Sequence, residues 1–229
     1  MSLSKLKSTA DSGLNGIKVL VYGRSGMGKT RLCGTAPAPV ILSAESGLLS
    51  LREYNLPVWE ITNVDELIEA YNWCAGSHEA RQFQTICLDS ITEIAEQVLA
   101  NAKKQSKDPR QAYGELITQM TDTAKKFRDL SGYNIYMSAK QEMNKDDVSG
   151  VSMYGPAMPG TKMGPALPYL FDEVFQLGKA KDQTTGQDFH FLRTKADFQN
   201  DAKDRSGALD EYEYPHLGNV FNKILGKAS

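Results

Sequence analysis

Short runs of apolar and β-branched residues recur along the chain, and each ends at a glycine or a polar residue. Four of these runs lie in the first 140 residues, at 17–22, 39–43, 83–88 and 133–138. Runs of this length and composition are typical of strands that are buried on both faces. The first two thirds of the chain therefore predict four strands of one buried sheet.

Helical periodicity fills the intervals between these strands. Asn63 followed three residues later by Glu66 is a helix-start signal, and apolar residues at helical spacing continue to Gly76. Residues 91–102 and 111–130 show the same period. Strands that alternate with helices predict an α/β fold whose mostly parallel central sheet is covered by helices on both faces.

The last third of the chain has a different pattern. Residues 142–168 are rich in Gly, Pro and Met and lack a hydrophobic period, which predicts a long irregular loop. Two further runs, at 171–179 and 188–195, flank the turn residues 184–186 and predict a C-terminal β-hairpin extension. Residues 217–225 have helical spacing and predict a final helix.

The N-terminus is small, polar and weakly basic, without a sustained period. It predicts a flexible arm over residues 1–16, ahead of a single domain over residues 17–229.

A phosphate-binding motif stands directly after the first strand. The segment matches G-x-x-x-x-G-K-[ST], and its residues are Gly23, Arg24, Ser25, Gly26, Met27, Gly28, Lys29 and Thr30. Glycines allow a tight turn whose N–H groups point inward, while Lys29 reaches the β- and γ-phosphates and Thr30 presents its hydroxyl to Mg²⁺. The motif predicts binding of ATP with Mg²⁺.

Two carboxylates follow neighbouring strands at the same edge of the predicted sheet. Asp89 ends the third strand, where a P-loop site needs an acidic partner for Mg²⁺. Glu45 ends the second strand, where it can act as the base that activates water. Each has a simpler interpretation, Asp89 as a turn or cap residue and Glu45 as a loop or helix-start carboxylate.

Composition narrows the classes of partner. A formal net charge of −2 over 229 residues excludes a globally basic nucleic-acid coat, so any nucleic-acid contact must come from a local patch. The three cysteines are far apart, which favours reduced thiols over disulfides or a zinc site. No apolar run approaches the roughly 20 residues of a membrane span, and no secretory signal is present, so we expect a soluble, cytoplasmic protein with no membrane partner.

The order of these features resembles the RecA-like P-loop NTPase core of recombinases, over roughly residues 17–200. Within that superfamily the chain is most similar to phage-encoded, core-only RecA-like single-strand annealing proteins. The resemblance implies that Glu45 activates the attacking water, that Asp89 is the acidic partner of Mg²⁺, and that Gln141 senses the γ-phosphate, with Lys140 as the alternative. If the chain is phage-encoded, as the resemblance implies, the expected location is the cytoplasm of a host cell.

Two segments correspond to the loops that face single-stranded DNA in that family, at about 103–112 and 142–166. The implied DNA-binding candidates are Lys103, Lys104, Lys107, Arg110, Lys145, Tyr154 and Lys162, with Tyr113 available to stack on a base. The first segment is alternatively a solvated helix end, and the second a flexible lid over the nucleotide.

Members of the superfamily complete their site with basic residues of the adjacent subunit. Arg193 and Lys195 resemble that basic-x-basic pair, and Lys203 with Arg205 is the second candidate; either pair is alternatively plain surface charge. The resemblance therefore implies a homo-oligomer, as a ring or a filament, and a single-stranded-DNA-binding protein as a partner.

The combined expectation is an ATP-binding protein that binds single-stranded DNA, promotes annealing in DNA recombination, and hydrolyses ATP at subunit interfaces. The lack of added domains favours annealing over strand exchange. One alternative is a P-loop kinase, whose phosphate-clamping lid needs arginines that residues 142–168 lack. Another is an assembly module controlled by ATP without significant hydrolysis, which would keep the same phosphate site.

Overall fold

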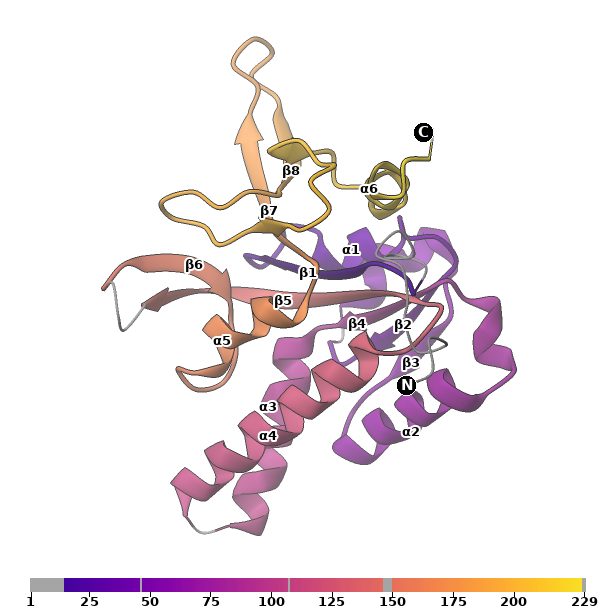
Figure 1. Ribbon diagram of the computed structural model, residues 1–229, viewed down its shortest axis with the longest axis vertical. Helices are drawn as coiled ribbons and strands as arrows, with labels where there is room; N and C mark the ends of the chain where they lie inside the picture. The colour runs from indigo at the N-terminus through magenta and orange to yellow at the C-terminus, as the bar shows by residue number, and fades with distance from the viewer. Residues whose placement is uncertain (1–14, 46, 107, 146–149, 228–229) are drawn as a thin grey trace, which may run out of the picture.

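A computed structural model of the chain describes residues 15–45, 47–106, 108–145 and 150–227 (Figure 1). Its strands form one sheet in the order β10-β8-β7-β1-β5-β4-β2-β3, with β6 paired to β5 and β9 paired to β7. The predicted arm falls almost entirely outside the described residues, so the division into an arm and one domain stays a prediction.

The centre of the sheet is parallel, as expected. β5 (Asn134–Lys145) lies between β1 (Lys18–Gly23) and β4 (Thr85–Asp89), and β2 (Pro39–Ser43) continues the sheet beside β4. All four predicted strands are confirmed. The sequence pattern missed β3 (Val58–Glu60), an edge strand whose short, partly exposed run carries little hydrophobic signal.

Helices cover both faces of the sheet. α2 (Val64–Gly76), α3 (Ile91–Gln105) and α4 (Pro109–Arg128) pack on one face, while α1 (Lys29–Cys33), η3 (Leu48–Tyr54) and α6 (Leu217–Ile224) pack on the other. A further short helical turn, η4, spans Glu79–Gln82. The predicted doubly covered α/β fold is confirmed. Within the described part of the chain, no helix combines the length and apolarity of a membrane span.

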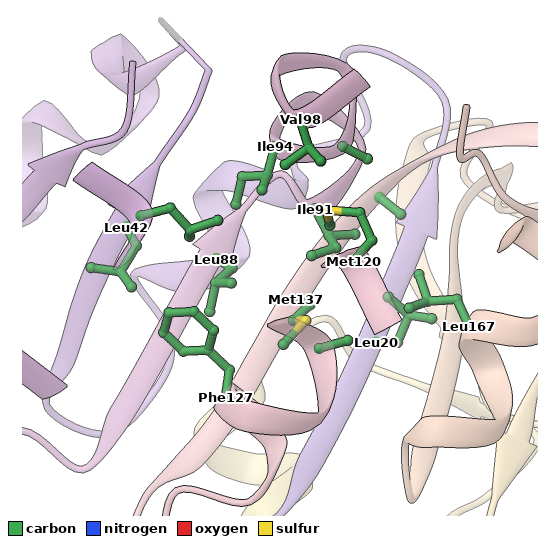
Figure 2. Close-up of a cluster of buried hydrophobic side chains, with 14 of the residues drawn as sticks. Leu20, Leu42, Leu88, Ile91, Ile94, Val98, Met120, Phe127, Met137 and Leu167 are labelled. Carbon is green, nitrogen blue, oxygen red and sulfur yellow. The ribbon is translucent and has the colours of Figure 1, made fainter. Parts of the chain in front are cut away.

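Apolar side chains of α3 and α4 interlock with those of the parallel strands (Figure 2). Phe127 from α4 lies beside Leu88 and Met137, which come from the adjacent strands β4 and β5. Ile91 and Ile94 bring the start of α3 into the same cluster. This packing fixes where β4 ends and α3 begins, and that junction carries much of the candidate site.

The expectation of an irregular loop over residues 142–168 was wrong. β5 continues to Lys145 and pairs antiparallel with β6 (Ser152–Pro156), after which come α5 (Met163–Ala166) and η5 (Leu167–Leu170). This two-stranded extension leaves the main sheet, so both of its faces are partly exposed and its residues need no hydrophobic alternation. Backbone pairing between β5 and β6 defines it.

The predicted C-terminal hairpin is confirmed. β7 (Glu173–Lys181) runs parallel to β1 and turns back into β8 (Asp188–Arg193), which projects from the body of the molecule (Figure 1). The short strands β9 (Lys203–Asp204) and β10 (Tyr212–Glu213) complete this side. Because β8 ends at Arg193, Lys195 lies in the following loop and not on the strand as expected.

Candidate functional site

The turn between β1 and α1 forms an open backbone cradle. Gly26 and Gly28 have φ angles of 77° and 96°, in the left-handed region that favours glycine. No atom lies within 4 Å of where a Cβ would stand on either residue. The cradle therefore leaves its backbone free for close approach by a group such as a phosphate.

Lys29 places a buried ammonium inside this turn. Its Nζ donates to the carbonyl oxygens of Gly23, at 2.9 Å, and Arg24, at 3.2 Å. Burial lowers the pKa of Lys29, while the nearby carboxylates of Glu45 and Asp89 oppose that shift. No carboxylate among the described residues forms an ion pair with it, so its charge is available to an anion in the cradle.

Asp89 and Thr30 meet at the end of β4. The Thr30 hydroxyl donates to Asp89 Oδ2 at 2.6 Å, and the Ser138 hydroxyl of β5 donates to Oδ1. Asp89 is only 1% exposed, and burial raises the pKa of its carboxyl. A buried carboxylate beside a threonine hydroxyl supplies the hard oxygen ligands that Mg²⁺ prefers, so these residues fit the ion.

Glu45 is held at the same edge by Ser90. The Ser90 hydroxyl donates to Glu45 Oε1 at 2.5 Å and also caps α3 by accepting from the Glu93 N–H at 3.3 Å. The backbone N–H groups of Ala44 and Glu45 donate to the Asp89 carbonyl, which joins the ends of β2 and β4. Sequence reasoning gave Ser90 no role, although Ser90 and Glu93 have the S-x-x-E spacing of a helix start.

β5 pairs with β1 as far as Lys140, which lies opposite Gly23, and Gln141 is the next residue of β5. Its Oε1 is buried and has no hydrogen-bond partner among the residues described. Lys140, the alternative sensor, is engaged instead, because its Nζ donates to Glu93 at 2.7 Å and Glu96 at 3.3 Å. The geometry leaves the sensor role of Gln141 a prediction.

The β5–β6 extension brings three of the DNA-binding candidates together. Lys145, Tyr154 and Lys162 line a cleft of about 620 Å³, along with Lys203 of β9. Tyr169 of η5 also lines this cleft and is 82% exposed, a feature that no sequence pattern indicated. We call this feature the basic cleft; of the charged residues that the structure describes, its lining holds the lysines Lys145, Lys162 and Lys203 and the carboxylate of Asp201.

The other candidates lie at the adjoining ends of α3 and α4. Lys103 Nζ is 5.5 Å from the centre of the Tyr113 ring, and Tyr113 in turn lies against Gly160. Lys104 and Arg110 are exposed beside them. Lys107 lies outside the described residues, so its position stays a prediction.

The four candidate trans-acting cations differ in their engagement. Arg193 forms ion pairs with Asp197, at 2.8 Å, and Glu211, at 3.6 Å. Lys203 and Arg205, the second candidate pair, also contact residues of the same chain. Lys203 Nζ donates to Pro168 O at 2.8 Å, and Arg205 pairs with Asp172 at 2.8 Å. Lys195 is exposed and makes no hydrogen bond or ion pair with any described residue.

A family model described as an AAA domain matches residues 15–206. No curated protein matches the chain. Among solved structures, a KaiC-like protein from the hyperthermophilic archaeon Pyrococcus horikoshii is similar, with a TM-score of 0.43 and 14% identity over 78% of this chain and 79% of that one. The family model covers most of the chain, and its match includes the P-loop, Glu45 and Asp89. The chain therefore belongs to the AAA domain family, and its P-loop lies within the matched residues.

Proposed function

We propose that this chain is an ATP-dependent protein that binds single-stranded DNA, promotes annealing in recombination, and acts as a homo-oligomer. One observation carries the proposal. We call the edge of the sheet that holds the P-loop, Glu45 and Asp89 the nucleotide edge, and β5 connects this edge directly to the basic cleft. The same strand contributes Ser138, which contacts Asp89, and Lys145, which lines the cleft.

The chemistry of the basic cleft suits a single strand. Lysine side chains neutralise backbone phosphates without regard to sequence, and an exposed tyrosine offers a face on which an unpaired base can stack. The basic cleft combines Lys145 and Lys162 with the exposed ring of Tyr169. Because the whole chain has a net charge of −2, this local excess of positive charge is distinctive.

The nucleotide edge supplies the groups for ATP hydrolysis. Mg²⁺, when bound, neutralises charge on the β- and γ-phosphates. In this chain Thr30 and Asp89 would hold the ion, Lys29 would bind phosphate oxygens, and Glu45 would accept a proton from the attacking water. Ser90 would keep the Glu45 carboxylate oriented toward that water, since it already donates to Oε1.

A cation from a second copy would complete the site. Lys195 is the preferred candidate of the four, because it forms no ion pair with the residues that the structure describes. Such a cation would stabilise charge developing on the γ-phosphate, and hydrolysis would then depend on assembly. A single-stranded-DNA-binding protein remains a proposed partner, by resemblance alone.

The two alternative functions make different demands on the same molecule. A kinase lid would need arginines over the phosphates, whereas the described part of residues 142–168 forms a strand, a short helix and the wall of a lysine-lined cleft. An assembly module would bind ATP and oligomerise with negligible turnover. Glu45→Gln distinguishes hydrolysis from an assembly role. If Glu45 activates water, the variant should bind ATP as the wild type does and turn it over about 100-fold more slowly.

Fluorescence anisotropy of labelled oligo-dT, measured with and without ATP and Mg²⁺ over a salt series, tests the DNA proposal. We expect affinity that falls steeply with salt. The double variant Lys145→Ala/Lys162→Ala should lower affinity about tenfold and flatten the slope of log affinity against log salt by about 1.4.

The matched control is Lys125→Ala/Lys126→Ala, which removes the same charge from an exposed turn of α4. It should leave DNA binding close to that of the wild type. Equal losses in both double variants would show that only overall charge matters, and wild-type binding no tighter than that of an acidic control protein would refute the proposal. A fluorescence assay with complementary labelled strands then measures annealing itself.

A further inference from the structure

We infer that Glu173 and Asp204 share one proton, and that this proton holds β9 and the turn after it against β7, so that residues 203–209 open as the pH rises. The inference goes beyond the proposed function, because the contact involves neither ATP nor DNA. It assigns the fold a pH-sensitive latch. The latch bears on the basic cleft, since Lys203 of β9 lines that cleft.

The sheet places the two carboxyl groups side by side. β9 is antiparallel to β7, and its register sets Asp204 opposite Glu173 and Lys203 opposite Val174. Residues directly opposite each other in an antiparallel pair point to the same face, with Cβ atoms about 5 Å apart. Since β9 has only two residues, the ladder offers little other backbone pairing to hold it in place.

Asp204 is the ionised member of the pair. Its Oδ1 accepts from the Ser206 hydroxyl at 2.5 Å and the Gly207 N–H at 2.9 Å. Its Oδ2 accepts from the Leu209 N–H at 3.0 Å. Burial alone would raise its pKa, but these donors and the contact with Glu173 hold the pKa of the Asp204 carboxyl below its ordinary value. This carboxylate therefore organises the turn that follows β9.

Glu173 is the protonated member. The residue is 1% exposed, and its Oε1 accepts from the Ser206 N–H at 3.2 Å. Its Oε2 accepts no hydrogen bond from any residue that the structure describes. An ionised carboxylate here would be buried, incompletely satisfied and beside a second negative charge. A proton on Oε2 removes that charge and makes the oxygen a donor to Asp204. Burial and the neighbouring Asp204 accordingly raise the pKa of Glu173 to about 8.

The other charged groups nearby do not neutralise Glu173. Asp172, the preceding residue, adds a further negative charge and pairs with Arg205 at 2.8 Å. Lys203 Nζ donates to a backbone carbonyl at 2.8 Å, and Lys223 of α6 pairs with two other carboxylates. In the part of the chain that the structure describes, none of these cations forms an ion pair with Glu173.

Lys18 is a second group that titrates in the same range. It precedes Val19, which lies opposite Glu173 in β1, so its side chain points to the other face of the sheet. There its Nζ donates to Tyr133 O at 2.6 Å, and burial lowers its pKa to about 8. An experiment must therefore separate the titration of Glu173 from that of Lys18.

The direction of the pH effect follows from the raised pKa. In the open form Glu173 is solvated and should titrate near 4.3, like an ordinary glutamate. The closed form thus holds the proton more tightly. Its extra stability is fully present below about pH 4.3, declines as the pH rises, and is lost as the pH passes 8. Between pH 6 and pH 8 the opening equilibrium should shift about 50-fold toward the open form.

Hydrogen exchange by quenched flow tests the latch. After correction for the intrinsic pH dependence of exchange, the wild-type amides of Gly207 and Leu209 should lose protection about 50-fold between pH 6 and pH 8. Glu173→Gln cannot ionise, and its amide can still donate to Asp204, so protection should stay nearly constant. The matched control is Glu69→Gln on an exposed position of α2, which should behave like the wild type.

Carbon-13 NMR of protein labelled at its glutamate carboxyl carbons tests the proton directly. The Glu173 signal, identified by its absence in Glu173→Gln, should titrate with a midpoint near pH 8. A midpoint near the ordinary 4.3 would overturn the shared proton. The pH series on the wild type needs no variant for its exchange readout, so the inference stays testable even if Glu173→Gln lowers stability.

Two exchange results would overturn the latch. One is unchanged protection in the wild type from pH 6 to pH 8. The other is an equal loss in Glu173→Gln, which would assign the effect to Lys18, since that lysine is present in both proteins.

A consequence for DNA rests on the proposed function and is measured separately. Affinity for oligo-dT should fall more from pH 6 to pH 8 in the wild type than in Glu173→Gln, because Lys203 leaves the cleft wall when β9 opens. Equal falls would refute a contact between Lys203 and DNA while the latch stands. Failure of the wild type to bind DNA at either pH would refute the proposed function, and the exchange result would still decide the latch.

Discussion

The nucleotide edge of the sheet and the basic cleft hold their polar groups in opposite ways. At the nucleotide edge, Asp89 and Glu45 accept from hydroxyls of the same chain, and Lys29 is buried in its own turn. In the basic cleft, Lys145 and Lys162 are exposed and face solvent. The polar groups of the nucleotide edge are held by internal hydrogen bonds, whereas the cleft lysines Lys145 and Lys162 point their charge into solvent.

This difference indicates how the two ligands would be recognised. A prepared site loses little free energy in ordering its groups and suits a small, fixed ligand such as ATP. Exposed lysines suit a long polyanion, whose bound counterions they release. The predictions below test whether the two regions differ in this way, beginning with the largest expected effect.

Two phenylalanine variants compare the contribution to the free energy of unfolding of a buried ring and of an exposed one. Phe127→Ala removes a buried ring from the α4 cluster and should lower the free energy of unfolding by about 3–5 kcal/mol. Phe198→Ala should change it by less than about 0.5 kcal/mol, because the ring is exposed. Urea unfolding followed by circular dichroism compares them; similar losses would mean that Phe198 has an internal role.

Two lysines test the nucleotide edge itself. Lys29→Ala should weaken ATP binding about 100-fold, because charge-assisted hydrogen bonds to the phosphates are lost. Lys195→Ala should leave binding nearly unchanged and lower turnover, since the role proposed for that residue is in the site of a second copy. Calorimetric titration and a phosphate-release assay separate these effects, and equal loss of binding in both variants would contradict the assignment.

Ser90 tests whether orientation of Glu45 matters. Ser90→Ala removes the donor to Glu45 and should lower turnover about tenfold with ATP affinity retained. Ser90→Thr keeps a hydroxyl and should restore most of that turnover. Because the change also removes a helix cap, stability is measured in parallel, and a pH profile that shifts in Ser90→Ala but not in Ser90→Thr identifies a positioning role.

Glu173 gives the smallest effect, and it depends on pH. This side chain is 1% exposed, its Oε2 has no partner among the described residues, and burial raises its pKa to about 8. Since the folded-state pKa is raised, stability present at low pH is lost as pH rises toward 8, by about 1 kcal/mol between pH 7 and pH 8. Glu173→Gln should remove that slope from unfolding curves measured at both values.

The parallel core was predictable from sequence because burial on both faces leaves a strong signal. The run at 17–22 became β1 with nearly the same bounds, and the run at 133–138 became the first half of β5. The P-loop, Glu45 and Asp89 were found for the same reason, since each follows such a run. Buried strands and the polar residues at their ends are the parts that local sequence determines best.

The extension of β5 was missed because nothing local specifies it. Residues 141–145 and 152–156 pair through backbone groups, and their side chains show no hydrophobic alternation. Tyr169 and Ser90 were missed for a related reason, as their surroundings come from segments distant in sequence. Contacts between segments distant in sequence produce no hydrophobic periodicity, so a sequence pattern cannot predict them.

β5 is a single strand of twelve residues, and its length has a mechanical consequence. The seven residue-to-residue steps from Ser138 to Lys145 span about 23 Å at the usual strand rise. A tilt of about 3° at Ser138 would displace the far end by about 1 Å, which is comparable to the difference between a formed and a broken hydrogen bond. The strand thus joins the point where Asp89 would hold the magnesium ion to the basic cleft, so a small tilt at the first would move Lys145 in the second.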